Sequence, residues 1–277
     1  MNYNYRVGII GHGFVGSAIR MSLEMHNFRC KENLFVYDKY KSESYFSKSL
    51  DDLLLTDIIF LCLPTLYDKN LETYDLTSLN EVIDYLSNKN YSGICLIKST
   101  IIPNTTLNYF EKYQNLKLIH NPEFLSAKTA FEDFHAQKHI VLGICSEKTH
   151  EYIDTIINFY KKYYTDAQIS IIMSTESEIM KLSANSFYSV KIQFFTEIYL
   201  LCEKLNCSYE TVKQTLLNNG WINPTHTNIP GPDGKISYGG MCFPKDMSAL
   251  QKYMEKINTP CDILKSTINE RNMMRDD

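Results

Sequence analysis

The fold of this chain is decided by the stretch Arg6-Val7-Gly8-Ile9-Ile10-Gly11-His12-Gly13-Phe14-Val15-Gly16. An apolar run leads directly into three glycines with the spacing Gly-x-Gly-x-x-Gly, and an amphipathic stretch follows them. Asp38 ends the next apolar run, 22 residues after the last of these glycines. Between a strand and a helix, such glycines permit a tight turn, close approach of the backbone to a pyrophosphate, and close packing of helix on strand. The stretch therefore predicts a dinucleotide-binding site rather than a plain glycine-rich turn.

The acidic residue at the end of the second run indicates which dinucleotide binds. Asp38 is placed to accept hydrogen bonds from a ribose 2′-hydroxyl and to repel a 2′-phosphate, which favours NAD over NADP. Lys39 and Lys41 beside it weaken that preference. The N–H groups of the helix N-terminus face the phosphates. We expect the following residues to contact NAD: Gly11, Gly13, Phe14, Val15, Gly16, Asp38, Thr65 and Thr100.

Short apolar runs alternate with amphipathic stretches through the first two thirds of the chain. This alternation is typical of a parallel sheet covered by helices. We therefore predict an α/β protein with a Rossmann-type, doubly wound parallel sheet. The predicted strands are 6–10, 34–37, 58–62, 94–97, 116–119, 139–142 and 169–172.

The pattern changes near Thr175. From Glu176 to about Leu205 the chain has no glycine or proline, and apolar residues recur every three or four positions. This pattern predicts one long central helix. Shorter helices are expected over 209–217, 244–256 and 261–273. We predict a NAD-binding Rossmann domain over residues 1–174 and an all-helical domain over residues 175–277.

Composition and charge exclude several classes of protein. With 277 residues, 44% of them hydrophobic, the chain is neither disordered nor of low complexity. The net charge is −4 and no basic run exceeds Lys161-Lys162, so a nucleic-acid partner is not expected. The longest apolar stretch, 58–64, is about a third of a membrane span, and residues 1–6 lack the apolar segment of a signal peptide. The eight cysteines are scattered without a CxxC pair, which favours reduced thiols over disulfides or a metal site. We therefore expect a cytoplasmic protein with no membrane partner.

A second informative segment is Tyr238-Gly239-Gly240-Met241-Cys242-Phe243-Pro244-Lys245-Asp246. The two glycines remove side-chain bulk, so that a substrate can approach the backbone. Pro244 suits the first position of a helix, which leaves Cys242 at the positive end of that helix, with Lys245 nearby. Such a position favours a thiolate nucleophile, whereas most cysteines of a reduced protein are buried and structural. The local pattern leaves both roles open for Cys242.

Several motifs occur in the order seen in one enzyme family. The glycine fingerprint is followed by Lys98-Ser99-Thr100 with Pro103, Asn121-Pro122-Glu123-Phe124-Leu125, Lys181 with Asn185, and Gly239 to Asp246. In this combination the chain resembles the UDP-glucose and GDP-mannose dehydrogenases, which are nucleotide-sugar 6-dehydrogenases. The resemblance runs from about residue 5 to the C-terminus. It implies an NAD-dependent oxidation of a sugar C6 alcohol to a carboxylate, with UDP-glucose to UDP-glucuronate as the leading reaction, in polysaccharide biosynthesis.

The resemblance also implies a role for each matching residue. Cys242 forms a thiohemiacetal and then a thioester with the substrate, because a plain aldehyde is a poor hydride donor. Lys181 and Asn185, four residues apart on one helix face, stabilise oxyanions. Asp246 assists deprotonation of the alcohol with Thr100 and a water, and Glu123 is the general base for thioester hydrolysis.

The chain also departs from the family pattern. Full-length members carry a third, nucleotide-binding domain, and this chain is expected to be a short form without it. The arginine that members give across the dimer is absent near Pro224, where His226 and Lys235 are candidate substitutes. By resemblance, the long helix starting near Glu176 makes the core of a homodimer. A monomer that buries this helix against its own first domain is the alternative.

Two other functions stay open at this point, and so does a subunit that needs a separate nucleotide-binding chain. A single-step 3-hydroxyacid dehydrogenase shares the two-lobed plan and uses the helix lysine, but it needs no thiol. A non-catalytic NAD-binding or sensory protein fits the absent domain and arginine. The combined presence of Thr100, Glu123, Lys181, Asn185, Cys242 and Asp246 favours the nucleotide-sugar dehydrogenase.

Overall fold

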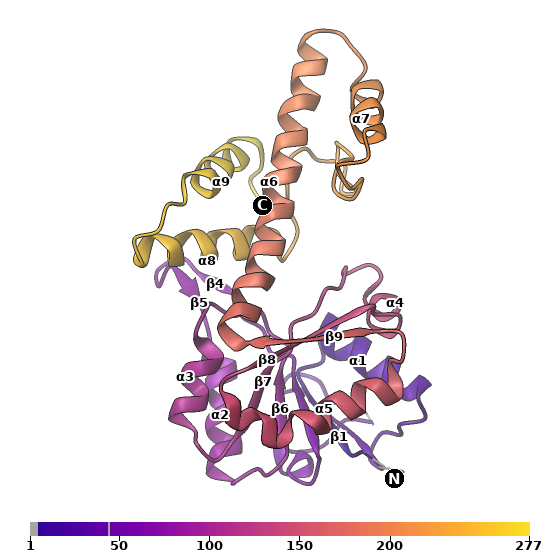
Figure 1. Cartoon of the computed structure of the whole chain (residues 1–277), viewed down its shortest axis with the longest axis vertical. Helices are drawn as coiled ribbons and strands as arrows, with labels where there is room; N and C mark the ends of the chain where they lie inside the picture. Colours follow the sequence, from indigo (N-terminus) through magenta and orange to yellow (C-terminus); the bar gives the residue numbers. More distant parts are fainter. Residues whose placement is uncertain (1–4, 44) are drawn as a thin grey trace. The chain divides into compact units, whose positions relative to one another are not determined.

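The computed structural model describes residues 5–43 and 45–277. Residues 1–4, which belong to the segment predicted not to be a signal peptide, lie outside the described residues. A seven-stranded sheet has the order β2-β1-β3-β6-β7-β8-β9 (Figure 1). Its strands are β1 (Val7–Ile10), β2 (Leu34–Tyr37), β3 (Ile58–Leu61), β6 (Ile94–Ile97), β7 (Lys117–His120), β8 (His139–Ile144) and β9 (Gln168–Met173). Each lies within two residues of a predicted strand. The apolar runs therefore locate the whole sheet.

The direction of one strand pair differs from the expected parallel sheet. β7 and β8 are antiparallel, with His120 opposite Gly143, whereas the other neighbouring pairs are parallel. Apolar runs mark a buried strand but carry no information about its direction. The outer pair, β8 and β9, is thus reversed relative to the five strands that carry the glycine loop.

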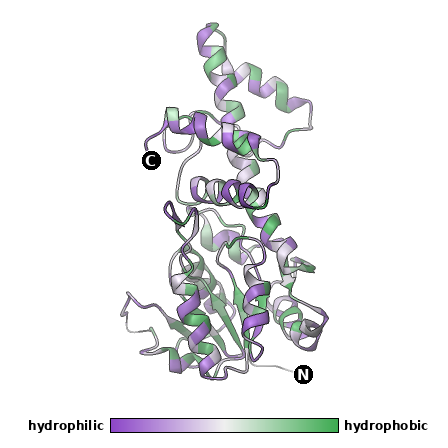
Figure 2. Ribbon diagram, turned by 90° about the vertical axis from the view of Figure 1, so that its left-hand side faces the viewer, coloured by the Kyte–Doolittle hydropathy of each residue, from purple (hydrophilic) through white to green (hydrophobic). Residues whose placement is uncertain are grey.

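Helices cover both faces of the sheet and give the first unit two apolar cores. α1 (Phe14–Met25), α4 (Ala130–His135) and α5 (His150–Tyr163) pack on one face, and α2 (Thr77–Asn88) and α3 (Thr105–Lys112) on the other. In Figure 2 the strands are mostly hydrophobic while the helices carry both colours. Such striped helices bury one side and expose the other. Short 3₁₀ turns, η1 (Leu50–Leu53) and η2 (Glu147–Thr149), complete the connections.

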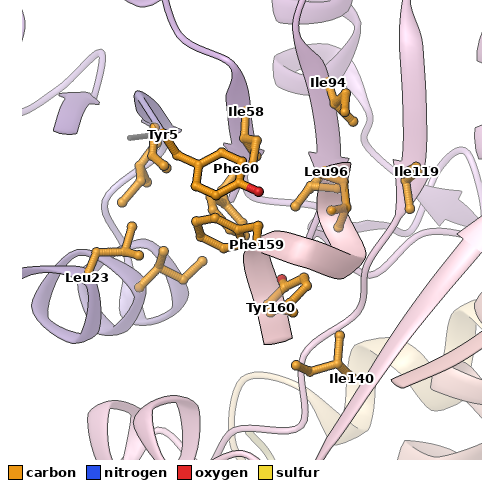
Figure 3. Packing of buried hydrophobic residues seen from close by; sticks show 14 of the residues in the cluster. Tyr5, Leu23, Ile58, Phe60, Ile94, Leu96, Ile119, Ile140, Phe159 and Tyr160 are labelled. Atoms are coloured by element: carbon orange, nitrogen blue, oxygen red, sulfur yellow. The ribbon is translucent and has the colours of Figure 1, made fainter. Parts of the chain in front are cut away.

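The core on the α5 face is aromatic. Phe159 and Tyr160 of α5 lie against Phe60 of β3 and Leu96 of β6 (Figure 3). Phe159 meets Phe60 with ring centroids 6.1 Å apart, and Tyr5 meets Phe159 edge-on at 5.3 Å. Full burial of side chains of this size contributes about 1.5–3 kcal/mol each. This packing stabilises the sheet beneath the glycine loop.

The second unit is mainly helical. It contains α7 (Tyr209–Asn218), α8 (Phe243–Lys256), α9 (Asp262–Met274) and most of α6 (Ser174–Lys204), the predicted long helix. The chain divides into two compact units, one comprising the chain up to Leu66 and Asp75–Lys181, the other Tyr67–Tyr74 and Leu182–Asp277. The short strands β4 (Tyr67–Asp68) and β5 (Thr73–Tyr74) therefore belong with the helices. The predicted domain boundary between residues 174 and 175 stays a prediction.

In the described part of the chain, no helix combines the length and the apolar character that crossing a membrane requires.

Candidate active site

The glycine loop between β1 and α1 is shaped by backbone crowding. Gly11 has φ +90°, and a Cβ there would stand 2.3 Å from the carbonyl oxygen of Cys62. A Cβ on Gly16 would stand 2.0 Å from the carbonyl oxygen of Gly11. At Gly13, in contrast, no atom of the described residues other than its two chain neighbours lies within 4 Å of a Cβ position. Two glycines thus serve the turn and the helix packing, and the middle one leaves open space.

The open space lies at the N-terminus of α1. Gly13 is the N-cap residue and supplies no capping side chain, and the first turn carries no acidic residue. Phe14 is 55% exposed, whereas Val15 packs against the apolar core. Unoccupied backbone donors at a helix N-terminus favour phosphate groups. The loop therefore fits the pyrophosphate of a dinucleotide.

Asp38 lies directly after β2 and folds its carboxylate toward the glycine loop. One oxygen accepts the His12 backbone N–H at 2.8 Å, and the other accepts the Tyr40 N–H at 2.9 Å. A carboxylate has about four acceptor positions, so capacity remains for a ribose hydroxyl. Lys41 donates to the His12 carbonyl at 2.6 Å. Of the two lysines expected to weaken the preference for NAD, Lys41 is thus bonded to the loop backbone, and Lys39 pairs with Glu81 at 3.2 Å.

Thr65 and Thr100 link the loops that follow β3 and β6. The Thr65 hydroxyl is buried and donates to the Thr100 carbonyl at 2.7 Å. Ser99 donates to the Leu63 carbonyl at 2.7 Å and accepts from the Leu63 N–H at 3.0 Å. The carboxyl ends of these neighbouring parallel strands form the edge at which ligands bind in open α/β sheets. Both predicted cofactor threonines lie at this edge.

Glu123 and Lys181 form an ion pair in the first unit. The Lys181 ammonium lies 3.0 Å from a Glu123 carboxylate oxygen and donates to the Glu123 backbone carbonyl at 2.6 Å. The other carboxylate oxygen accepts the Leu125 N–H at 2.6 Å. Lys181 is only 4% exposed. An ammonium has three donors and Glu123 takes two, so one remains for a substrate oxygen.

A second buried lysine, Lys98, holds the segment that carries Glu123. Its ammonium donates to the Asn121 side-chain oxygen at 3.2 Å and to the Pro122 carbonyl at 3.1 Å. Tyr160 donates to the same Asn121 oxygen at 2.5 Å, while the Asn121 amide donates to the Val141 carbonyl at 2.8 Å. Burial lowers the pKa of Lys98 to about 8. The motif lysine is therefore a structural support for Glu123.

Asp246 is the centre of a polar cluster in the second unit. It is fully buried, and one oxygen accepts from Tyr74 and from Lys245, each at 2.5 Å. The other oxygen accepts the Asn185 amide at 2.6 Å. Burial, and then the charge of Asp246, raise the pKa of Tyr74 well above its usual range, so the phenol keeps its proton. The pairing of Asn185 with Asp246 brings two predicted site residues together.

Cys242 stands at the start of α8, one turn before this aspartate. It is the N-cap residue, its side chain is exposed, and its carbonyl accepts the Asp246 N–H at 3.0 Å. The helix begins at Phe243, so Pro244 is its second residue and not the predicted first. A helix N-terminus favours the thiolate over the thiol. Cys242 is thus exposed and not sealed in an apolar core.

Of the two glycines before Cys242, Gly239 differs from expectation, whereas the Cβ position of Gly240 is open, as expected. A Cβ on Gly239 would stand 2.2 Å from the guanidinium of Arg275, so the space is filled by that side chain and not reserved for a substrate. Arg275 is buried and bonds Asp233 at 2.6 Å and the Ser237 carbonyl at 3.2 Å. Gly240 has φ +81°. The arginine therefore fixes the loop that leads to the thiol.

The two candidate substitutes for the cross-dimer arginine lie in different surroundings. His226 packs its ring against Tyr188 and Phe243, with centroids 4.8 and 5.4 Å away, and burial followed by the charge of Lys191 lowers its pKa. The Lys235 ammonium lies 3.5 Å from Asp277. His226 is thus part of an aromatic group, and Lys235 is part of a surface ion pair.

The sequence of both units matches models of known domains. Residues 29–164 match the NAD binding domain of the UDP-glucose/GDP-mannose dehydrogenase family, and residues 175–272 match its central domain. The chain belongs to this family. The UDP-glucose 6-dehydrogenase of Rickettsia prowazekii is 30% identical over 96% of this chain and 67% of its own length. The chain spans about two thirds of the length of the Rickettsia relatives with this name.

Solved structures show the same fold. A UDP-glucose dehydrogenase from Pyrobaculum islandicum superposes with a TM-score of 0.81 at 21% identity, over 96% of this chain and 67% of that one. The 3-hydroxyisobutyrate dehydrogenase of Mycobacterium tuberculosis has a TM-score of 0.70 at 14% identity, over 96% and 91%. The predicted family, Rossmann-like fold class and NAD cofactor are therefore confirmed, and so is membership of an NAD-dependent oxidoreductase family.

The predicted site residues of this family member fall into local groups. Glu123 pairs with Lys181, Thr65 bonds Thr100, and Asn185 bonds Asp246 near Cys242. Sequence reasoning assigned no role to Lys98, although its motif was recognised. The contributions of Tyr74 and Arg275 were not predicted, because their partners are remote in sequence and no sequence pattern indicates such pairs.

Proposed function

We propose that this chain oxidises the C6 alcohol of a nucleotide sugar to the uronic acid in two NAD-dependent steps, with UDP-glucose as substrate. The observation that carries this proposal is the position of Cys242. Cys242 is exposed and is the N-cap residue of α8, and the fully buried Asp246 follows one turn later with Asn185 bonded to it. Membership of the UDP-glucose/GDP-mannose dehydrogenase family supports the reaction class.

The thiol is needed because the first oxidation gives an aldehyde. NAD, when bound, accepts hydride. The Cys242 thiolate adds to the aldehyde carbon to give a thiohemiacetal, which is oxidised to a thioester on the same sulfur. The N-terminus of α8 favours the thiolate before attack and when it leaves again. An exposed N-cap position lets the sulfur reach a substrate without displacing buried side chains.

We assign the remaining roles as the family resemblance implies them. Asp246, with Thr100 and a water, takes the proton of the alcohol, and Glu123 activates the water that hydrolyses the thioester. Lys181 and Asn185 donate to the oxyanions, Lys181 through the donor that Glu123 leaves unused. Tyr74 and Lys245 hold the Asp246 carboxylate in one orientation. Each of these groups is held before substrate arrives, which lowers the reorganisation needed during reaction.

We also propose that a second copy of the chain covers part of α6. Phe187, Phe194 and Leu201 recur every seven residues and are 62%, 50% and 53% exposed. Residues at this spacing share one helix face, and exposed apolar faces of this kind mark interaction surfaces. A homodimer through α6, acting in the cytoplasm, is the arrangement that we propose.

The test counts cofactor against product. Purified protein is incubated with NAD and UDP-glucose, GDP-mannose or a 3-hydroxyacid, with NADH read by absorbance and the acid by mass spectrometry. We expect two NADH per uronic acid from UDP-glucose. Cys242→Ser should lower uronic acid formation by roughly a thousandfold or more, because no thioester can form. Cys207→Ser, which alters the other exposed cysteine, should retain activity.

Three results would contradict the proposal in different ways. One NADH per molecule of a 3-hydroxyacid, unaffected by Cys242→Ser, indicates the single-step dehydrogenase. Tight NAD binding with no turnover of any substrate indicates a non-catalytic protein. Formation of two NADH per uronic acid from GDP-mannose alone would support the proposed chemistry, with GDP-mannose and not UDP-glucose as the substrate.

A further inference from the structure

The C-terminal end of α6 brings two cysteines together. The Cys207 N–H donates to the Cys202 carbonyl at 3.0 Å, and the Asn206 N–H donates to the Glu203 carbonyl at 3.2 Å. Asn206 has φ 53°, in the left-handed region. These three features define a Schellman motif, in which the second residue beyond the helix contacts the last turn. Cys207 and Cys202 occupy those two positions.

The two cysteines of this pair are neighbours in different surroundings. Burial, and then the neighbouring Cys207 side chain, raise the pKa of Cys202. Cys202 is 3% exposed and packs in an apolar cluster with Phe195 and Tyr209, whereas Cys207 is exposed. The backbone hydrogen bond from Cys207 to Cys202 holds the two residues side by side, as a disulfide between them requires.

We propose that Cys202 and Cys207 are an oxidation site that forms a reversible intramolecular disulfide when the protein meets a peroxide. The exposed Cys207 thiolate attacks hydrogen peroxide, which gives a sulfenic acid and one water. The Cys202 sulfur then attacks the sulfenic sulfur, the S–O bond breaks, and the second water leaves with the Cys202 proton. Two thiols lose two electrons and two protons, and the peroxide becomes two waters. The site is independent of the proposed dehydrogenase function.

Other cysteines are less suited to this reaction. Cys30 bonds Glu24, and its pKa is raised to about 11 by burial and then by that bond. Burial raises the pKa of Cys62 and of Cys95 to about 12. Burial also raises the pKa of Cys202, so closure of the disulfide should accelerate as pH rises, since the thiolate is the attacking form. Cys207, the exposed member of the pair, makes the first contact with the oxidant, and the neighbouring Cys202 closes the disulfide.

The test maps disulfides in the whole folded protein. The reduced protein is treated with hydrogen peroxide, remaining thiols are alkylated, and the tryptic digest is analysed without reduction. We expect residues 192–204 and 205–213 to appear as one disulfide-linked pair, at roughly tenfold higher yield than any other pair of cysteines. Dithiothreitol should release the two peptides. The yield in a fixed time should rise between neutral and mildly alkaline pH.

Variants make the assignment specific. Cys207→Ser and Cys202→Ser should each abolish the linked peptide, and Cys202→Ser should leave a trappable sulfenic acid on Cys207. Cys30→Ser is the matched control and should give an unchanged yield. The proposal is overturned if Cys202 and Cys207 are both alkylated while other cysteines are oxidised. It is also overturned if Cys207 in the unmodified sequence pairs with a different cysteine.

Discussion

The two glycine loops of this protein meet different obstacles. In the loop between β1 and α1, a Cβ on Gly11 or Gly16 would strike backbone carbonyl atoms at 2.3 and 2.0 Å. In the loop before α8, a Cβ on Gly239 would strike the guanidinium of Arg275 at 2.2 Å. Backbone at the end of a buried strand can move little, whereas a side chain can be removed by substitution. The first loop is therefore confined by backbone, at Cys62 and within the loop itself, and the second by one remote side chain.

The largest effect is expected where the obstacle is backbone. Gly16→Ala should lower the free energy of unfolding by about 3 kcal/mol or more, because α1 must move away from β1 to admit the methyl group. Urea denaturation followed by circular dichroism measures the loss. Met21→Ala, at a 40% exposed position of the same helix, is the control and should shift the midpoint little. An unchanged midpoint for Gly16→Ala would show that the close contact with Gly11 is wrong.

A smaller and rescuable effect is expected at the second loop. Gly239→Ala should cost about 2 kcal/mol, because it displaces a buried guanidinium that bonds Asp233 and Ser237. Arg275→Ala removes the obstacle together with those bonds. The double variant should therefore be more stable than the sum of the single losses predicts, by roughly 1–2 kcal/mol. Additive losses in the same denaturation assay would contradict direct contact between the two residues.

This contrast also explains what could be predicted from the sequence. The glycine loop, the strands and α6 depend on neighbours within a few residues, so apolar periodicity and the Gly-x-Gly-x-x-Gly spacing located them. Tyr74 lies 172 positions from Asp246, and Arg275 lies 36 positions from Gly239. No local pattern encodes such pairs, because the fold alone brings them together. The antiparallel β7–β8 pair was missed for a related reason, since burial dictates apolar residues and not strand direction.

The candidate site shows the same difference between what local sequence predicts and what only the fold determines. Family motifs identified Glu123, Lys181, Asn185, Cys242 and Asp246. They did not indicate that Glu123 engages two donors of Lys181, or that both oxygens of Asp246 are already occupied. Those bonds depend on burial and on which side chains face one another. A motif therefore names the reacting groups, and the fold decides which of their donors and acceptors remain for a substrate.

The smallest effect on stability, with a large effect on binding, is expected at Gly13. Its Cβ position is open and its φ is −79°, so the methyl group of Gly13→Ala meets neither crowding nor left-handed strain. Alanine is a poorer N-cap than glycine but reduces the entropy of the unfolded chain, and these opposing effects leave the free energy of unfolding within about 1 kcal/mol. The same methyl group occupies the space through which a pyrophosphate approaches the backbone, so the Kd for NAD should rise at least about tenfold. Gly240→Ala, equally open but at φ +81°, should cost about 1 kcal/mol through strain alone. Calorimetric titration with NAD decides the matter: if Gly13→Ala binds NAD as tightly as the unmodified chain, the open space at the N-terminus of α1 is not where the phosphates lie.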